Sequence, residues 1–236
     1  MHPHEYALME SSESSHWWFV AKRIFIDAII PKNHYSRILD VGCGTGEMTT
    51  FLNDRGSVTR IENSRYAQQY LRAKHIPYID VSITAYPIDP NAYDLICFFD
   101  VLYHRSIVND VNVLQETHTR LKKNGLLCVT DCAIPQLWSN HDVLMHARER
   151  YTKRDLEQKI VSSGFTILRS SYIYFCTFPF FVLQRLLNKY ISFETVKTPF
   201  TLINSFLILL CSFEAKLLKK INFPIGSSVI ILAQKL

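Results

Sequence analysis

One glycine-rich stretch constrains the fold of this chain more than any other feature. Residues 36–46, SRILDVGCGTG, join a short apolar strand to three glycines in GxGxG spacing. Glycines at a strand end let the backbone turn tightly and let a ligand approach the main chain. A dinucleotide loop would place its third glycine at position 47, which is Glu47. The carboxylates of Asp40 and Glu47 disfavour a pyrophosphate and favour a ligand that carries an ammonium group.

An acidic residue ends the next expected strand. This strand, VTRIE, covers residues 58–62, and Glu62 lies 22 residues after Asp40. At this spacing a carboxylate can accept hydrogen bonds from two ribose hydroxyls. The loop and the acid together predict a site for a nucleoside that bears an amino acid.

The remaining segments alternate between strand-like and helix-like patterns, which indicates a doubly wound sheet. The predicted fold is therefore α/β: a Rossmann-like, doubly wound seven-stranded sheet with an antiparallel last strand, an N-terminal helix and a helical insertion. The expected strands cover residues 36–41, 58–62, 77–81, 93–100, 124–132, 166–175 and 227–236. The expected helices cover residues 16–30, 47–55, 64–75, 111–123, 152–165, 178–190 and 200–220.

Length and composition predict one domain, because 236 residues with 48% apolar content suit a single core. Its expected parts are an N-terminal helical cap (1–35), a cofactor-binding core (36–171), a helical insertion (177–224) and a final strand (226–236). The first fifteen residues are polar and are not expected to be a signal peptide. Six cysteines without a CxxC pair predict reduced thiols in a cytoplasmic protein.

Four ordered motifs resemble those of the class I S-adenosylmethionine-dependent methyltransferases. ILDVGCGTG is similar to the first motif of that family, Glu62 to its second-strand acid, and YDLICFFDVLYH to its fourth-strand region. LKKNGLLCV resembles the LKPGG turn, with Lys123 for the proline and Asn124 for the first glycine. Asn tolerates the left-handed conformation that such a turn needs. The resemblance covers about residues 36–170 and implies S-adenosylmethionine as cofactor.

The resemblance also implies which residues contact the cofactor. Asp80 is the candidate for the third-strand acid beside the adenine, and Ser82 with its backbone is the alternative. The implied contacts are Gly42, Gly44, Gly46, Glu62, Asp80 and Asp100, to which the ammonium argument adds Asp40. The alternative is a strand-helix turn in a Rossmann-like fold that binds no ligand.

Residues 137–152, LWSNHDVLMHARERYT, follow the fifth expected strand, at the edge where doubly wound sheets bind ligands. His141 and His146 would point about 140° apart on a helix, so no metal site is predicted. Asp142 and His146 are four residues apart and would share one helical face. We therefore expect Asp142 to orient His146 as a general base, with His104 as the reserve candidate. A structural role for both imidazoles is the alternative.

The same stretch and the N-terminal helix supply candidate substrate contacts. Two arginines are placed to clamp an anionic group, although they also suit a surface salt-bridge lattice. Two tryptophans suit a lid over the site or a staple that holds the first helix on the sheet. The predicted substrate residues are Trp17, Trp18, His141, Arg148, Arg150 and Tyr151.

The segments HWWF (16–19) and LWSNHD…HARERY also resemble one bacterial subset of the family. Glu149 replaces the first arginine of the RRY ending of that subset. The subset is associated with cell-envelope polysaccharide and lipid-linked glycan pathways. The resemblance therefore implies an acceptor of that kind.

Basic charge is concentrated in the apolar tail. Residues 172–236 hold seven basic and two acidic residues, which accounts for the whole net charge of +5. A nucleic-acid partner is not expected, because the basic residues form no dense polar stripe. The tail instead favours contact with anionic lipid or an amphiphilic substrate. The helical pair within 177–224 is expected to be extra core, a homodimer interface or a lipid-contacting surface.

A membrane-spanning helix is not expected, since the longest apolar run, residues 206–211, is far shorter than the ~20 residues required. The expected location is the cytoplasm, either free or at the inner face of the membrane. The predicted function is methyl transfer from S-adenosylmethionine to a hydroxyl of a glycan, lipid-linked or other amphiphilic small molecule. The alternatives are an N-methyltransferase of a small metabolite or peptide amine, and a non-catalytic cofactor-binding or membrane-associated protein.

Overall fold

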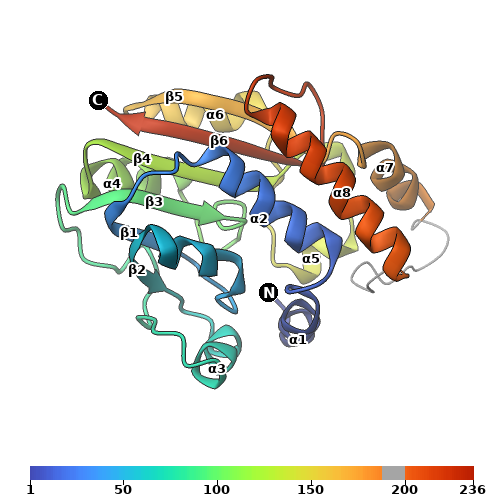
Figure 1. Ribbon diagram of the computed structural model, residues 1–236. Coiled ribbons are helices and arrows are strands. Elements are labelled where there is room, and N and C mark those ends of the chain that lie inside the picture. Colours follow the sequence, from blue (N-terminus) through green and yellow to red (C-terminus); the bar gives the residue numbers. More distant parts are fainter. Residues whose placement is uncertain (188–199) are drawn as a thin grey trace.

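A twisted six-stranded sheet forms the centre of the molecule (Figure 1). The computed structural model describes residues 1–187 and 200–236. The sheet has the order β2-β1-β3-β4-β6-β5, with β1 to β4 parallel and β6 antiparallel to both of its neighbours. Its strands are β1 (Tyr35–Val41), β2 (Gly56–Ile61), β3 (Tyr93–Phe99), β4 (Leu121–Cys132), β5 (Phe165–Ile173) and β6 (Ser228–Lys235). The predicted Rossmann-like fold and its antiparallel last strand are confirmed.

Helices cover both faces of this sheet. One face carries α4 and α6, and the other carries α2 and α8 (Figure 1). The α-helices are α1 (Pro3–Ser12), α2 (Trp17–Ile29), α3 (Arg65–Ala73), α4 (Asp110–Arg120), α5 (Asn140–Leu144), α6 (Lys153–Ser162), α7 (Phe178–Leu187) and α8 (Thr201–Leu218). Two 3-10 segments, η1 (Glu47–Arg55) and η2 (Pro135–Leu137), complete the described elements. The helix expected over 47–55 is thus present as a 3-10 helix.

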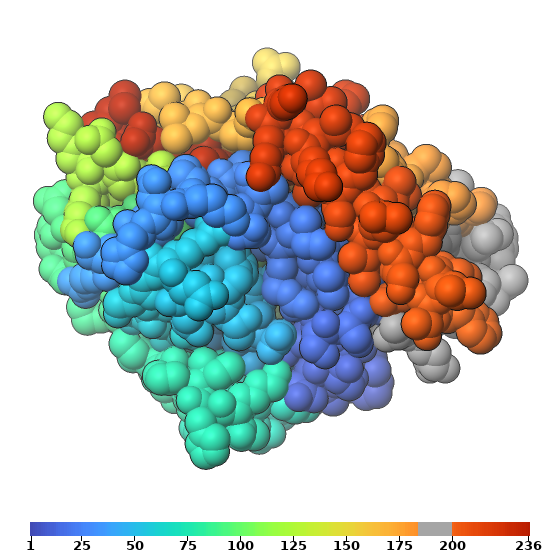
Figure 2. Space-filling view, viewed as in Figure 1, coloured from blue at the N-terminus to red at the C-terminus, as the bar shows by residue number. Residues whose placement is uncertain are grey.

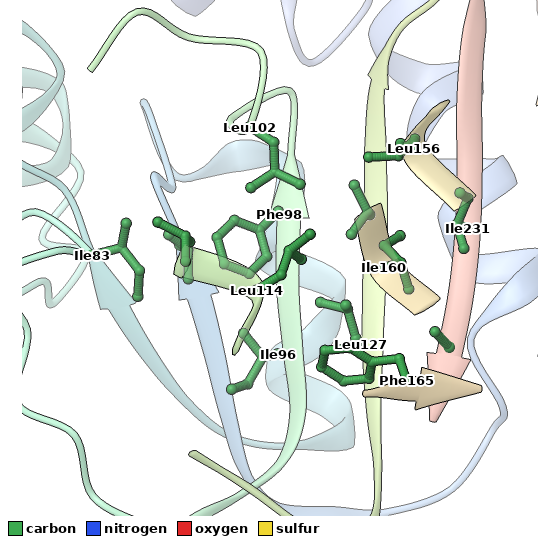
Figure 3. Close-up of a cluster of buried hydrophobic side chains, with 14 of the residues drawn as sticks. Ile83, Ile96, Phe98, Leu102, Leu114, Leu127, Leu156, Ile160, Phe165 and Ile231 are labelled. Atoms are coloured by element: carbon green, nitrogen blue, oxygen red, sulfur yellow. The ribbon is translucent and has the colours of Figure 1, made fainter. Parts of the chain in front are cut away.

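Alternate residues of the central strands fill two separate cores. Ile96 and Phe98 of β3 point to the α4 and α6 side, where Leu114 and Ile160 meet them (Figure 3). Leu95 and Cys97 belong to the core on the α2 and α8 side. The nearly uniform apolar sequence of β3 follows from this double burial.

The sheet has six strands among the described residues, where seven were expected. The missing strand is the segment 77–81, which makes a single parallel bridge between Ile61 and Ile79. Pro77 offers no N–H to a ladder, and Ile79 is 45% exposed at the sheet edge. The segment therefore buries too little apolar surface to stabilise a full strand. The helix expected over 111–123 also ends earlier, at Arg120, because Leu121 already belongs to β4.

Two helices of the expected insertion are present, and residues 188–190 of the first lie outside the described part of the chain. In α8, 18 residues have a mean hydropathy of 1.6, and 22% of them are buried. By length and composition this helix is apolar enough to cross a membrane. The sequence analysis did not expect a helix of this hydropathy, because it considered only uninterrupted apolar runs. Asn204, Ser205 and Ser212 interrupt the run in this helix.

Candidate active site

A cavity of about 930 Å³ opens at the carboxyl ends of the parallel strands. Residues directly after four strands line it: Gly42 after β1, Glu62 after β2, Asp100 after β3 and Cys132 at the end of β4. β1 lies between β2 and β3, so the direction of strand order changes there. Ligands of doubly wound sheets bind at such a switch point. The volume suits a ligand of cofactor size together with part of a second molecule.

The glycine loop adopts the conformation that its sequence predicts. Gly42, Gly44 and Gly46 have φ angles of 65°, 58° and 86°, which side chains with a Cβ rarely adopt. A Cβ on Gly42 would lie 2.9 Å from Cγ2 of Val101. Gly42 and Gly44 line the cavity, so the backbone itself forms this wall.

Glu62 is held beside this loop by main-chain donors. Its Oε2 accepts a hydrogen bond from the Gly44 amide at 2.9 Å, and its Oε1 accepts one from the Ser64 amide at 2.8 Å. The carboxylate is 6% exposed and lines the cavity, and burial raises its pKa. Each oxygen keeps a lone pair for a ribose hydroxyl.

Asp40 supplies a second carboxylate at the base of the loop. It is 1% exposed, and its Oδ2 accepts a hydrogen bond from Thr49 Oγ1 at 2.5 Å. Burial raises the pKa of Asp40 to about 6, against the smaller opposing effects of Thr49 and Arg60. An ammonium group in the cavity would favour the ionised form. These residues fit an amino-acid-bearing nucleoside, with Glu62 for the ribose and Asp40 for the ammonium end.

Two imidazoles also line the cavity. His104 Nε2 is 3.3 Å and His146 Nδ1 is 2.8 Å from the amino nitrogen of Met1, and the ring centroids are 5.9 Å apart. Burial, with the Met1 amino group next in effect, lowers the pKa of His104 to about 4 and also lowers that of His146. Both rings are therefore neutral at pH 7 and can accept a proton.

Comparisons with known proteins agree with this geometry. A family model described as a methyltransferase domain matches residues 38–125. Residues 38–125 of this chain thus resemble a class I S-adenosylmethionine-dependent methyltransferase domain. The match supports the predicted S-adenosylmethionine cofactor and the predicted methyltransferase class.

Two curated methyltransferases are similar over the core. A malonyl-[acyl-carrier protein] O-methyltransferase from Enterobacter lignolyticus is 27% identical over 144 residues, which cover 56% of this chain and 56% of the relative. A trans-aconitate 2-methyltransferase from Deinococcus radiodurans is 26% identical over 148 residues, which cover 60% of this chain and 52% of the relative. The chain thus spans about half the length of the curated relatives it matches.

Solved methyltransferase structures share the fold. An S-adenosylmethionine-dependent methyltransferase from Mesorhizobium loti aligns with a TM-score of 0.58 and 15% identity, covering 89% of this chain and 95% of that one. A geranyl diphosphate methyltransferase in complex with GPP and sinefungin aligns with a TM-score of 0.62 and 14% identity, covering 91% of this chain and 77% of that one. At such identities the likeness concerns the fold alone.

Two of the predicted cofactor contacts lie outside the cavity. Asp80 is exposed, and its Oδ1 accepts a hydrogen bond from Gln68 at 2.7 Å. The alternative, Ser82, bonds Thr84 and does not line the cavity either. Gly46 packs under α3, where an added Cβ would meet Leu71 and Ile76 within 2.8 Å. Asp100 does line the cavity and forms an ion pair with the buried amino group of Lys22.

The sequence-based pairing of Asp142 with His146 is not formed among the described residues. Asp142 Oδ1 accepts a hydrogen bond from Arg150 Nε at 2.7 Å, and its Oδ2 accepts one from the Ser139 amide at 2.8 Å. Residues 142 and 146 would share one face only on a continuous helix. Helix α5 ends at Leu144, and His146 has a φ of 55°, so the two side chains do not meet. Asp142 is therefore a buried structural partner of Arg150.

The predicted arginine clamp is also replaced by internal contacts. Arg148 donates to the carbonyl of Val108 at 3.1 Å and to Asp110 Oδ2 at 2.9 Å. Tyr151 is 1% exposed, and its hydroxyl donates to Asp110 at 2.7 Å. Arg148 and Tyr151 do not line the cavity, whereas Arg150 does so from its position beside Asp142. Arg148 therefore takes part in a salt-bridge network, which was the alternative to the anion clamp.

The remaining predicted substrate residues do reach the cavity, which Trp17, Trp18 and His141 all line. Trp18 also stacks on Tyr174 with an interplanar angle of 5° and centroids 5.9 Å apart. The Tyr174 hydroxyl donates to the Trp18 carbonyl at 2.6 Å. The tryptophan pair thus staples α2 to the molecule and forms the cavity wall, which joins the two sequence-based alternatives. Among residues 1–187 and 200–236, no group of three or more His, Cys, Asp or Glu could hold a metal ion.

The sequence analysis missed the contribution of α1. Tyr6 of this helix is buried and stacks on Tyr66 with centroids 6.5 Å apart. Glu13, just after α1, accepts a hydrogen bond from the Thr45 hydroxyl of the glycine loop. The N-terminal residues that line the cavity, besides Trp17 and Trp18, are Met1, Glu5, Tyr6, Met9, Glu13, His16 and Phe19. The polar sequence before residue 16 gave no strong helical pattern by which to find them.

Proposed function

We propose that this chain transfers the methyl group of S-adenosylmethionine to a hydroxyl of a glycan, lipid-linked or other amphiphilic small molecule. The observation that carries the proposal is the pair of neutral imidazoles, His104 and His146, in the cavity that the glycine loop also lines. Apolar walls from Trp17 and Phe181 of the same cavity suit an amphiphilic acceptor.

The chemistry follows from these positions. When bound, S-adenosylmethionine supplies an electrophilic methyl group for direct displacement. The protein aligns the acceptor and excludes water, while Glu62 and Asp40 hold the donor in the loop. A sugar or alcohol hydroxyl reacts faster when a base accepts its proton. His146, whose Nδ1 already accepts from an amino group, has this role in the proposal, with His104 beside it.

One observation also supports an amine acceptor as the second candidate. Both imidazoles contact the amino nitrogen of Met1, so their ring nitrogens lie where an amine can donate hydrogen bonds to them. An amine needs only to be neutral to attack a methyl group, and it does not depend on a base in the transition state. The two candidates therefore differ in their dependence on the histidines.

The test measures release of S-adenosylhomocysteine with panels of hydroxyl and amine acceptors. We expect turnover of a hydroxyl acceptor to fall about 100-fold or more in His146→Ala, in the range of a lost general base. His34→Ala is the control, because His34 is exposed and is not part of the cavity. Full turnover in the double variant of His104 and His146 would support the amine acceptor. Absence of binding in a calorimetric titration with S-adenosylhomocysteine would contradict both enzyme functions.

The proposal includes the location. A lipid-linked or amphiphilic acceptor is reached most readily at a membrane surface, so we place the protein on the inner face of a membrane. A small-molecule acceptor is then the expected partner. The apolar helix α8 provides the surface for this location.

A further inference from the structure

The outer face of α8 is a continuous apolar stripe. Its residues recur every three or four positions, so they lie within about 40° of one line along the helix. The exposed fractions are 85% for Leu202, 61% for Phe206, 69% for Leu209 and 59% for Phe213. Figure 2 shows α8 along the molecular surface beside α2. Four large apolar side chains in one row are more than scattered surface exposure.

The opposite face of α8 is fixed to the domain by buried polar contacts. Asn204 Oδ1 accepts a hydrogen bond from the Trp17 amide at 2.8 Å, and its Nδ2 donates to the Ser15 carbonyl at 2.9 Å. Glu214 is fully buried and accepts hydrogen bonds from the amides of Phe175 and Cys176 at 2.9 and 3.0 Å. These contacts attach α8 to the domain near both of its ends.

These contacts argue against α8 crossing a bilayer. Removal of α8 from the domain would break four hydrogen bonds and expose Glu214 to hydrocarbon, which is strongly unfavourable for a carboxylate. A helix that is bound to protein on one side and apolar on the other instead lies parallel to a membrane surface. Only the outer face of α8 is therefore available for contact with lipid, because the opposite face is bound to the domain.

The charges at the end of the stripe indicate which surface it contacts. Lys216 continues the stripe in the last turn of α8, and Lys219 and Lys220 follow directly, all of them exposed. The one carboxylate of α8 is Glu214, on the buried face. A second copy of this face would bring lysines against apolar side chains or other lysines, without acids to pair with them. Anionic lipid headgroups provide the missing negative charge.

Helix α7 carries apolar side chains both in the cavity and on the surface. Phe181 of α7 lines the cavity, while its neighbour Phe180 is 68% exposed. Trp17, which is bonded to Asn204 of α8, lines the same cavity. A membrane at the stripe would therefore lie beside α2 and near residues of the cavity in which an amphiphilic acceptor is proposed to bind.

We propose that the face of α8 formed by Leu202, Phe206, Leu209 and Phe213, with Lys216, Lys219 and Lys220, docks on an anionic membrane surface. The helix lies parallel to the membrane, with its side chains inserted among the headgroups. This inference deepens the proposed function, since it names the surface from which a lipid-linked acceptor comes. Docking itself requires neither cofactor nor acceptor.

The test is co-sedimentation of the full chain with vesicles, without cofactor or acceptor. One vesicle set contains equal parts of phosphatidylglycerol and phosphatidylcholine, and the other contains phosphatidylcholine alone. We expect binding to the anionic set and at least tenfold weaker binding to the neutral set. The difference arises because three lysines near the surface attract anionic headgroups.

Two double variants separate the apolar and the charged parts of the surface. Phe206→Ser with Leu209→Ser removes inserted side chains and is expected to weaken binding at least tenfold. Lys216→Glu with Lys220→Glu is expected to abolish the preference for anionic vesicles. Their matched controls lie on α6, across the sheet: Val161→Ser, at a residue that is 54% exposed, and Arg154→Glu, at an exposed arginine. Both controls are expected to bind as the unaltered chain does.

Three outcomes would overturn the proposal. The first is no binding of the unaltered chain to anionic vesicles, and the second is binding that neither double variant weakens. The third is a dimer in sedimentation velocity without lipid that Phe206→Ser with Leu209→Ser dissociates, which would assign the stripe to a second copy. Because the vesicles contain no acceptor, a failed methyl-transfer assay leaves each of these results interpretable.

Discussion

The buried carboxylate of Glu13 accepts a hydrogen bond from the hydroxyl of Thr45, in the middle of the glycine loop. The other oxygen of Glu13 accepts a hydrogen bond from Lys74 at 2.8 Å. The segment between α1 and α2 is thereby joined both to the loop and to the residue after α3. The N-terminal segment thus helps to form the cavity in which the cofactor is proposed to bind.

Glu13→Gln is expected to weaken binding of S-adenosylhomocysteine about tenfold, because a hydrogen bond to a charged group contributes about 1.5–3 kcal/mol. The measurement is isothermal titration calorimetry. Glu10→Gln is the control, since Glu10 is 3.7 Å from Lys74 and does not line the cavity. Equal affinities of the two variants would show that the contact with Thr45 has no effect on the site.

Glu62→Gln is expected to weaken S-adenosylhomocysteine binding by a factor of about 10 to 100, as loss of a charge-assisted hydrogen bond to the ribose would. Asp80→Asn, at an exposed residue outside the cavity, is expected to leave the affinity unchanged. Calorimetry measures both. Circular dichroism checks that Glu62→Gln, which alters contacts with two backbone amides, remains folded.

Cofactor affinity is expected to depend on pH through Asp40. The pKa of this residue is about 6 in the free protein, so its carboxyl group is protonated below that pH. A bound ammonium group prefers the carboxylate, so binding and protonation compete. The dissociation constant of S-adenosylhomocysteine is expected to rise about tenfold per pH unit below 6 and to be constant above 7. Asp40→Asn is expected to bind weakly with no such slope, and a slope that survives in Asp40→Asn would contradict the assignment.

Turnover of a hydroxyl acceptor is expected to persist at mildly acidic pH when the cofactor is saturating. The pKa of His104 is lowered from 6.5 to about 4 and that of His146 is lowered too, so the neutral base forms persist below pH 6.5. In the plot of kcat against pH, the midpoint of the acidic limb therefore lies at a lower pH than the 6.5 of an ordinary histidine. A limb centred at 6.5 would show that neither imidazole is the base.

Asp142→Asn is expected to reduce the free energy of unfolding by about 3–5 kcal/mol, because it leaves Arg150 as a buried charge with a neutral partner. Both side chains of this ion pair are 2% exposed. Urea unfolding measures the change, and Asp155→Asn, at an exposed helix cap, is the milder comparison. The acidic limb of kcat is expected to stay where it is, since Asp142 does not contact His146. A shifted limb would restore the orienting role that the sequence spacing predicts.

The sequence predicts the parts of the fold that local pattern determines. The glycine loop, the doubly buried β3 and the capping box of Thr152 and Asp155 each depend on neighbouring residues or on uniform burial. These features place Gly42, Gly44 and Glu62 in the cavity as expected. Pattern alone is sufficient there because strand ends and turns position the side chains.

The errors concern residues whose partners are distant in sequence. Arg150 pairs with Asp142, a contact that the sequence spacing did not indicate. The segment 77–81 stays a single bridge because its edge position offers little burial. Tyr6 and Glu13 belong to the site through contacts with Tyr66 and Thr45. Periodicity carries no information about such contacts, since they form only after the N-terminal segment folds back over the loop.

Asn204 links α8 to the start of α2 by two hydrogen bonds. Its amide group connects α8 to the backbone at Ser15 and Trp17, and Trp17 forms part of the cavity wall. Because these contacts are direct hydrogen bonds, a displacement of α8 is expected to move Trp17 as well. A membrane under α8, as proposed above, would therefore also support the tryptophan wall of the cavity.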